Sequence, residues 1–408
     1  EIWMTDTTFR DGQQSVSPFT PAQIEHLFKL MSRLGGPNGL VRQSEFFLYT
    51  AKDREALERC QALGLAFPEI TTWIRANPKD FELVKAAGVK ETGILVSCSD
   101  YHIFHKMHLT RRQAMDKYLG IVKSALSLGV KPRCHFEDIT RADFYGFVVP
   151  FATELMALSR ESGLPIKIRA CDTMGYGVPY TEAAMPRSVA GIIYGLQHYS
   201  DVPSECLEWH GHNDFHRVHI NGATAWLCGC NALNATLFGY GERTGNPPLE
   251  GAIMEYIALK GDWCGIDTTT ITEAAEYLRS IGFPIPDNYP FAGRHFNTTR
   301  AGIHAGGLRR DERIYNIMDT TLLLNRPPRV AITDKTGTDG VAIWVNEFLG
   351  TKGKPNEVKL TQVVKIQKWV MDQYNVYGRQ SAISEEELEH QVRTHLPDLY
   401  RENKASAV

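Results

Sequence analysis

Two short segments that lie far apart in the chain carry residue types that bind divalent metals. Near the N-terminus, the segment Met4–Gln14 places Arg10 directly beside Asp11. His210 and His212 are separated by one residue, so both side chains fall on the same face of a strand. One carboxylate oxygen and two imidazole nitrogens form a three-ligand metal site with positions left open for a substrate.

The metal interpretation has competing structural explanations. Histidines spaced in this way on a strand are as often simply hydrogen-bonded, and Asp11 is also a typical turn residue before glycine. Asn246 adds an amide oxygen as a further or water-bridged ligand, unless it is only a loop residue before Pro247. Two histidines and a carboxylate accept Mn, Co, Zn or Fe, so the sequence leaves the metal open.

One expected strand carries polar residues on a single face. Alternation places Arg133, His135 and Glu137 on that face, which points into the interior of the expected barrel. Glu137 could be a general base or hold one in place, although a salt bridge between Arg133 and Glu137 explains the pair equally well. Arg141, in the loop that follows, is either a clamp for a substrate or a solvated side chain.

Three further residues are candidates for contact with a substrate. Arg10 could bind a carboxylate or stabilise an enolate oxygen. Thr173 could donate a hydrogen bond to a carboxylate, or it could cap a helix. His304 lies among glycines in what reads as a flexible loop, where it is either a placed acid or base or a turn residue.

Short apolar runs alternate with helical patterns up to about residue 260. The expected strands are Ile2–Phe9, Leu40–Leu48, Phe67–Arg75, Glu91–Cys98, Lys131–Glu137, Pro165–Asp172, Glu205–His210 and Ala232–Phe238. The expected helices are Pro21–Leu34, Lys52–Leu63, Pro78–Ala87, Leu109–Leu128, Val148–Ser162, Thr181–Gln197 and Phe215–Cys228.

This alternation predicts an α/β fold, a (β/α)8 TIM barrel whose polar loops gather at one face. An open doubly wound sheet is the alternative, weakened because no G-x-G-x-x-G follows the first strand. We expect the barrel to occupy residues 1–285. Residues 286–408 are expected to form a linker and a mainly helical extension, with helices at Lys359–Tyr374 and Ser384–His395. Ser384, followed three residues later by glutamate, has the spacing of a capping box.

Composition indicates a soluble globular protein. Hydrophobic residues make up 43% of the 408 and charged residues 22%, and the net charge of −3 gives no field to attract nucleic acid. No apolar run reaches membrane-spanning length. Eight cysteines without a C-x-x-C pair fit buried thiols in a reducing cytoplasm. Because the chain begins inside an expected strand, we expect native residues before Glu1.

Four motifs together resemble a superfamily of metal-dependent β/α-barrel acyltransferases and lyases. It includes 2-isopropylmalate synthase, homocitrate synthase and hydroxymethylglutaryl-CoA lyase. Asp6–Gln14 is similar to its D-x-T-x-R-D/E-G-x-Q signature, His210–Asp214 to H-x-H-N-D, and Gly241–Asn246 to G-E-R-x-G-N. Ala301–His304 resembles a histidine motif of the synthase branch. The resemblance covers essentially residues 1–310.

The resemblance implies that acetyl-CoA condenses with a 2-oxo acid held by a divalent metal. It assigns Asp11, His210 and His212 to the metal with Asn246 close by, Arg10 to the oxo oxygen, Thr173 and Gln14 to substrate binding, and Glu137 and His304 to proton transfer. A substrate with a second carboxylate needs another cation, for which Arg133 and Arg141 are the candidates.

The residues of three further sequence segments favour one branch of this superfamily. Val41–Phe47, Asp214–His219 and Phe296–His304 resemble the branch that takes oxaloacetate. A sister enzyme for 2-oxoglutarate or 2-oxoisovalerate is one alternative. The other alternative is a catalytically inactive barrel that only binds a metal or a CoA ester. The resemblance also suggests a homodimer.

Overall fold

The computed structural model describes residues 1–300 and 302–405 and divides the chain into two compact units. The first unit is Glu1–Ile285 and the second is Pro286–Val408. The motifs on which the sequence interpretation rests lie almost entirely in the first unit. Ala301, the first residue of the histidine motif, lies outside the described residues.

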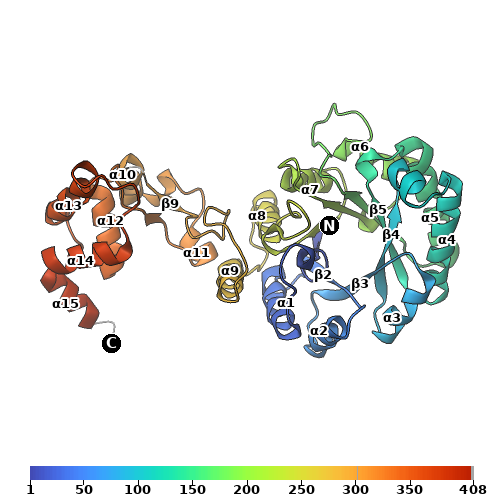
Figure 1. The fold of residues 1–408 in the computed structure, drawn as a ribbon, viewed down its shortest axis with the longest axis horizontal. Helices are drawn as coiled ribbons and strands as arrows, with labels where there is room; N and C mark the ends of the chain where they lie inside the picture. The colour runs from blue at the N-terminus through green and yellow to red at the C-terminus, as the bar shows by residue number, and fades with distance from the viewer. Residues whose placement is uncertain (301, 406–408) are drawn as a thin grey trace. The chain divides into compact units, whose positions relative to one another are not determined.

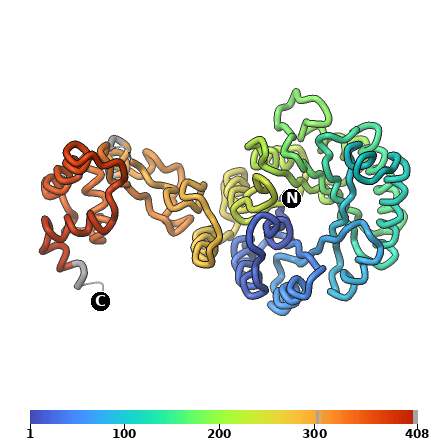
Figure 2. Tube along the Cα trace, in the orientation of Figure 1, coloured from blue at the N-terminus to red at the C-terminus, as the bar shows by residue number. Residues whose placement is uncertain are grey.

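The first unit is a closed barrel of parallel strands (Figure 1). Its strands are β1 Trp3–Asp6, β2 Val41–Phe46, β3 Glu69–Ile74, β4 Glu91–Ser97, β5 Lys131–Glu137, β6 Lys167–Asp172, β7 Leu207–Gly211 and β8 Ala232–Ala235. Each pairs with the next in chain order, and β8 pairs with β1 to close the ring. In Figure 2 the blue N-terminal trace accordingly lies beside the yellow-green trace that ends the barrel. The predicted TIM barrel is confirmed.

Helices follow the strands and surround the barrel. They are α1 Pro21–Gly35, α2 Ala51–Ala62, α3 Phe81–Ala86, α4 Arg111–Ser127, α5 Val149–Ser162, α6 Val189–Ser200, α7 Val218–Leu227, α8 Leu249–Lys260 and α9 Thr270–Ser280. Thr20, Thr50 and Thr110 begin α1, α2 and α4 with capping boxes, in which the threonine side chain accepts from a backbone N–H of the first turn. These caps fix where the loops that follow β1, β2 and β4 end, and loops of this kind, at the carboxyl ends of the strands, carry the polar residues of a TIM-barrel site.

One expected helix begins later than predicted. The apolar pattern predicted a helix over Thr181–Gln197, but α6 begins at Val189, where Ser188 caps it. The residues before Ser188 form turns, and Pro186 lies among them without a backbone N–H to donate. The first strand is also shorter than predicted, because Asp6 accepts hydrogen bonds from the backbone and hydroxyl of Thr8 and turns the chain there.

The second unit is mainly helical, as predicted. It contains α10 Gly302–Arg310, α11 Thr320–Leu324, α12 Thr338–Leu349, α13 Val364–Asn375, α14 Glu385–His395, α15 Pro397–Ala405 and the parallel pair β9 Thr298–Thr299 and β10 Arg329–Val330. Aliphatic residues of α12, α13 and α14, such as Val345, Val370 and Val392, form its core. Ser384 and Glu387 form the predicted capping box of α14.

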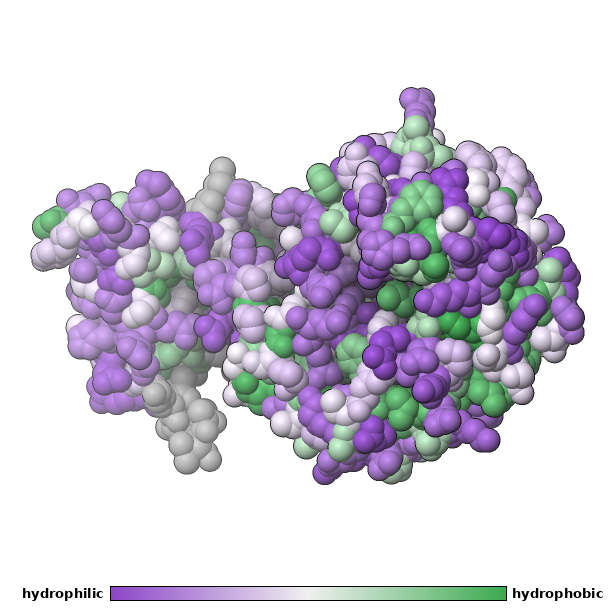
Figure 3. Space-filling view, turned by 45° about the vertical axis from the view of Figure 1, so that its right-hand side comes forward, coloured by the Kyte–Doolittle hydropathy of each residue, from purple (hydrophilic) through white to green (hydrophobic). Residues whose placement is uncertain are grey.

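The surface carries no dominant apolar face in the view of Figure 3. Hydrophilic side chains cover most of the face shown, and hydrophobic side chains occur in small scattered patches. Among the helices that the structure describes, none combines the length and the apolar character that crossing a membrane requires.

Candidate functional site

The carboxyl ends of neighbouring strands bring the candidate residues into one row. Ser97 of β4 is in register with Glu137 of β5, Glu137 with Cys171 of β6, and Cys171 with His210 of β7. Neighbouring strands lie about 4.8 Å apart, so the backbones of Glu137 and His210 are separated by roughly 10 Å. This row forms one wall of the barrel mouth, where TIM-barrel enzymes carry their active sites.

Asp11, His210 and His212 form the one group of buried histidine, cysteine or acidic side chains in the described part of the chain that could hold a metal ion. Asp11 Oδ2 lies 3.8 Å from His210 Nε2 and 3.9 Å from His212 Nε2, and the two nitrogens lie 3.2 Å apart. Three atoms with these separations can all lie about 2.1 Å from a common point, the usual length of zinc–nitrogen and zinc–oxygen bonds. The donor set and its geometry therefore fit a divalent cation.

The charge states of these side chains also suit a metal. Burial lowers the pKa of both His210 and His212, so the imidazoles are neutral and their nitrogens can bind a cation. Burial by itself raises the pKa of Asp11, but the Arg10 guanidinium and the hydrogen bond from the Asn246 amide lower it, and the net result is a pKa below its ordinary value. Asp11 is therefore a carboxylate at neutral pH.

Two asparagines orient the ligands. Asn234 of β8 donates through its amide nitrogen to Thr5 O at 3.3 Å, which leaves its oxygen to accept from His210 Nδ1 at 2.7 Å. The proton of His210 is thereby on Nδ1, and Nε2 keeps its lone pair for the metal. Asn246 donates through its amide nitrogen to Asp11 Oδ2 at 2.7 Å. The Asn246 amide nitrogen thus orients the Asp11 carboxylate, while its Oδ1 is buried without a hydrogen-bond partner, so the predicted role of this oxygen as a further metal ligand stays a prediction.

Arg10 is held by a carboxylate that the sequence interpretation missed. Its Nε donates to Glu45 Oε2 at 2.9 Å, and its Nη1 lies 3.5 Å from Asp11 Oδ1. Glu45, on β2, is fully buried and also accepts from Thr7 Oγ1 at 2.9 Å. Arg10 therefore stands between the metal ligands and the interior of the barrel with its orientation fixed.

Glu45 belongs to a buried ion network that fills the barrel. It pairs with Arg133 at 2.7 Å and with Arg169 at 3.1 Å, and Arg169 pairs with Glu208 at 2.7 Å. Arg133 also lies 2.9 Å from Glu91. The salt bridge between Arg133 and Glu137 that the sequence allowed is therefore wrong, because Glu45, Glu91 and Glu208 satisfy Arg133 instead. The side chain of Arg133 is 1% exposed, which leaves no path for a substrate carboxylate to reach it.

The sequence contains a signal for this network, but it becomes visible only when several strands are compared. Polar residues occur at alternate positions on four strands, such as Glu45 of β2, Arg169 of β6 and Glu208 of β7. Residues at alternate positions of a strand lie on the same face, so this pattern predicts that these side chains share the interior face of the barrel. Which carboxylate meets which guanidinium depends on the register between strands.

Glu137 lies at the mouth, at the end of β5. Its Oε2 accepts a hydrogen bond from Ser97 Oγ, and its side chain is 17% exposed. His102 Nδ1 lies 3.7 Å and Lys106 Nζ 3.9 Å from the same oxygen. Glu137 is thus partly open to the mouth, as a base for a bound substrate must be.

Thr173 and Arg141 meet at Asp138, directly after Glu137. Thr173 Oγ1 accepts from the backbone N–H of Asp138 at 2.9 Å, and Arg141 pairs with the Asp138 carboxylate at 2.8 Å. Thr173 caps no helix, because α6 begins only at Val189. Arg141 also stacks on Tyr101, at 4.6 Å from its ring centre, and its side chain is 33% exposed. Both residues therefore lie at the mouth.

Gln14 lies in the first unit and His304 in the second, and both side chains are exposed. Gln14 ends a short turn of 3-10 helix after Asp11 and is exposed. His304 was predicted to lie in a flexible loop, but it lies within α10, where it is exposed and its ring lies against that of Tyr315 at 4.5 Å between centroids, tilted by 45°. Glycines on both sides did not prevent the helix from forming. His304 belongs to the second unit, and its predicted role in proton transfer stays a prediction.

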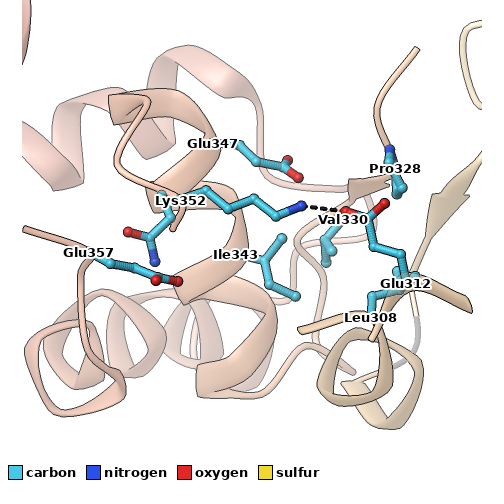
Figure 4. A pocket seen from close by; sticks show the side chains of 9 residues that line it. Leu308, Glu312, Pro328, Val330, Ile343, Glu347, Lys352 and Glu357 are labelled. Atoms are coloured by element: carbon cyan, nitrogen blue, oxygen red, sulfur yellow. Dashed lines mark hydrogen bonds and ion pairs between the residues drawn. The ribbon is translucent and has the colours of Figure 1, made fainter. Parts of the chain in front are cut away.

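A cavity in the second unit contains none of the predicted site residues. Lys352 crosses it to reach Glu312 at 2.5 Å, as Figure 4 shows, and Ile343 and Val330 line its apolar wall. The cavity holds about 50 Å³, room for a few water molecules. The barrel mouth therefore remains the candidate site.

A parallel barrel with two histidines and an aspartate at its mouth is a TIM barrel whose site could hold a metal ion. The family described as HMGL-like matches residues 1–278, and the chain belongs to this family. The resemblance recognised in the four motifs is confirmed.

Two relatives extend the similarity beyond the barrel. The chain is 50% identical over 408 residues to a citrate (Re)-synthase of Clostridium kluyveri, covering 100% of this chain and 90% of that protein. It is 57% identical over 402 residues to a citrate (Re)-synthase of Syntrophus aciditrophicus, covering 98% of this chain. The chain spans 64% of the length of the Syntrophus relative.

A solved structure supports the fold. The HMG-CoA lyase of Brucella melitensis superposes with a TM-score of 0.53 at 18% identity, covering 69% of this chain and 98% of that chain.

Proposed function

We propose that this protein condenses acetyl-CoA with oxaloacetate and hydrolyses the thioester to give citrate and CoA. The observation that carries the proposal is its 50% identity to a citrate (Re)-synthase over 90% of that relative's length. The barrel mouth supports it, because the three candidate metal ligands and a partly open glutamate lie at or just beyond the carboxyl ends of β1, β5 and β7. The choice of carbonyl face rests on the relatives alone.

The first requirement is to hold and activate the 2-oxo acid. Asp11, His210 and His212 would hold a divalent metal, with Mn, Co and Zn as the candidates. When bound, such a metal acts as a Lewis acid on the ketone and orients the oxo acid. Arg10, fixed by Glu45, directs its guanidinium to this place and stabilises negative charge on the oxo oxygen. A donor placed in this way contributes about 3–4 kcal/mol.

The second requirement is to remove a proton from the acetyl methyl group. Glu137 is the base that we propose, because its side chain is partly exposed at the mouth. The methyl C–H bond breaks toward Glu137, the methyl carbon bonds to the keto carbon, and the former keto oxygen gains a proton. Water then cleaves the thioester, and CoA leaves as the thiol. A positioned base typically contributes about 10²–10⁴-fold, and His304 is a further candidate for these proton transfers.

The remaining contacts concern the carboxylates of oxaloacetate. We assign the carboxylate next to the ketone to Thr173 and Gln14. We assign the second carboxylate to Arg141, because its side chain is 33% exposed whereas that of Arg133 is 1% exposed. Arg141 would exchange part of its contact with Asp138 for the substrate, so its replacement by Met should raise KM for oxaloacetate more than it lowers kcat.

The compartment, the oligomeric state and the metabolic role of the protein are part of the same proposal. We propose a cytoplasmic homodimer that supplies citrate to the tricarboxylic acid cycle. Eight cysteines without a disulfide in the described chain agree with a reducing compartment. Light scattering coupled to gel filtration measures the oligomeric state, and a monomeric mass would contradict the dimer.

A panel of oxo acids tests the proposed function. CoA release from acetyl-CoA is measured with oxaloacetate, 2-oxoglutarate, 2-oxoisovalerate and no acceptor, each with Mn, Co and Zn. We expect oxaloacetate to give the highest kcat/KM. If 2-oxoglutarate is turned over at least as fast, the protein is a sister synthase. If it binds metal but releases no CoA with any acceptor, the barrel is not a synthase.

A further inference from the structure

The turn after β4 is a π-helical segment, Tyr101–Lys106, at the barrel mouth. Ion pairs anchor its beginning, because Asp100 lies 2.7 Å from Arg111, which also lies 2.7 Å from Asp143. Helical turns with this wide hydrogen-bond pattern are rare and frequently occur at functional sites. Asp100, which precedes the segment, is therefore tied to α4, and Lys106 at its end lies 3.9 Å from Glu137 at the end of β5.

Three side chains from β4 and this segment converge on one oxygen of Glu137. Ser97 Oγ donates to Oε2, His102 Nδ1 lies 3.7 Å from it, and Lys106 Nζ lies 3.9 Å from it. Among the described residues, none makes a hydrogen bond or an ion pair with Glu137 Oε1. The carboxylate is thus asymmetric, with one anchored oxygen and one open oxygen.

His102 is itself fixed by its neighbours. Its Nδ1 lies 3.4 Å from Ser99 Oγ and 3.9 Å from Asp138 Oδ2. Ser99 Oγ donates to the same Asp138 oxygen at 2.6 Å, and Asp138 is completely buried. The imidazole is 20% exposed, so it stands at the edge of the mouth between Glu137 and solvent.

We propose that His102 and Lys106 are positioning residues that hold Glu137 by Oε2, so that Oε1 faces the methyl group of the acetyl thioester. The inference rests on the proposed function and deepens it. A carboxylate that rotates freely presents either oxygen in many directions, whereas one fixed by a serine, an imidazole and an ammonium is already oriented. Such orientation lowers the barrier of proton transfer without contributing to the binding of the oxo acid.

The test compares His102→Phe, His102→Gln, Lys106→Met and Lys106→Arg with wild type. His105→Gln is the matched control, because His105 lies on the same turn, is exposed and makes no contact with Glu137 that the structure records. The measurements are kcat, KM for each substrate, bound metal, and deuterium uptake from solvent into the methyl group of acetyl-CoA.

We expect His102→Phe to lower kcat and methyl exchange by about 10–100-fold, a part of what a general base contributes. KM for oxaloacetate and bound metal should stay within a factor of two. His102→Gln should recover part of the loss because its amide can still donate. Lys106 is 59% exposed, so Lys106→Met should cost only about 2–5-fold, and Lys106→Arg should restore it.

The outcomes separate this inference from the proposed function. If wild type releases no CoA with oxaloacetate, the proposed function fails, whatever the variants do. If wild type is active and His102→Phe keeps its kcat within a factor of two, the positioning role is overturned. The inference is also overturned if kcat, bound metal and KM change together in both His102 variants, because a purely structural role does that.

Discussion

Replacing Glu45 by Gln perturbs the residue on which the barrel interior and Arg10 both depend. The Glu45 carboxylate lies 2.9 Å from Arg10, 2.7 Å from Arg133 and 3.1 Å from Arg169. Gln keeps the size of the side chain but removes the charge, so three guanidinium groups lose a shared anion. Removing one member of a buried ion pair typically costs about 3–5 kcal/mol, because the partner charge stays buried.

The expected loss is measurable as a fall in the midpoint of thermal unfolding. For a barrel of this size, a loss of 3–5 kcal/mol corresponds to a shift of roughly 5–10 °C. Glu58→Gln on the exposed face of α2 is the matched control and should shift the midpoint by less than about 1 °C. Calorimetry of both variants and wild type, without added ligand, is the assay.

The difference should depend on pH in a defined direction. Burial by itself raises the pKa of Glu45, but Arg169, Arg10 and Arg133 outweigh it and hold the pKa well below its ordinary value of 4.5. A carboxyl group whose pKa is lowered by folding stabilises the fold at pH values above its ordinary pKa. This stabilisation is lost progressively as the pH falls below that ordinary pKa toward the lowered one. The advantage of wild type over Glu45→Gln should therefore be constant near pH 7 and shrink below about pH 4.5. A variant as stable as wild type at pH 7 would refute the role assigned to Glu45.

Three further predictions, one of them with a control substitution, give independent tests. Asn234→Ala removes the acceptor of His210 Nδ1 and should weaken metal binding about 10–100-fold, measured by metal titration; unchanged affinity would contradict the orienting role. Gly245→Ala should abolish metal binding, because Gly245 has φ +94 and a Cβ there would lie 2.1 Å from Gly239 O, beside Asn246. Gly120→Ala, in the open middle of α4, is its control and should stabilise by about 0.5–1 kcal/mol, and equal effects of the two would refute this argument. Ser384→Ala should destabilise α14 by about 1 kcal/mol in chemical unfolding, and no change would show that the capping box is dispensable.

The strands and their order could be predicted because apolar runs and turn residues mark each β/α unit. β5 was predicted with its observed bounds, Lys131–Glu137. The first strand was predicted too long, because threonine is common in strands and Phe9 is apolar, whereas the chain turns at Asp6 through side-chain hydrogen bonds. The helix predicted over Thr181–Gln197 was begun too early for a similar reason, since local turns occupy the chain up to Ser188, where α6 is capped.

The candidate metal ligands could be predicted from residue type and spacing, but their environment could not. Arg133 and Glu137 are an even number of positions apart on β5, so they were predicted to share a face, which is correct. Their separation along the strand is about 13 Å, so each meets a different set of partners from other strands. Glu45 and Glu208 acquire their importance only when register places them opposite Arg133 and Arg169.

X-ray absorption spectroscopy of the metal-loaded protein tests the central claim most directly. With one equivalent of zinc or cobalt bound, we predict scattering from two imidazoles and at least one oxygen at about 2.0–2.2 Å. His212→Ala should lose one imidazole contribution and most of the bound metal. A wild-type spectrum without imidazole scattering, or full metal occupancy in His212→Ala, would contradict the assignment of Asp11, His210 and His212 as the metal site.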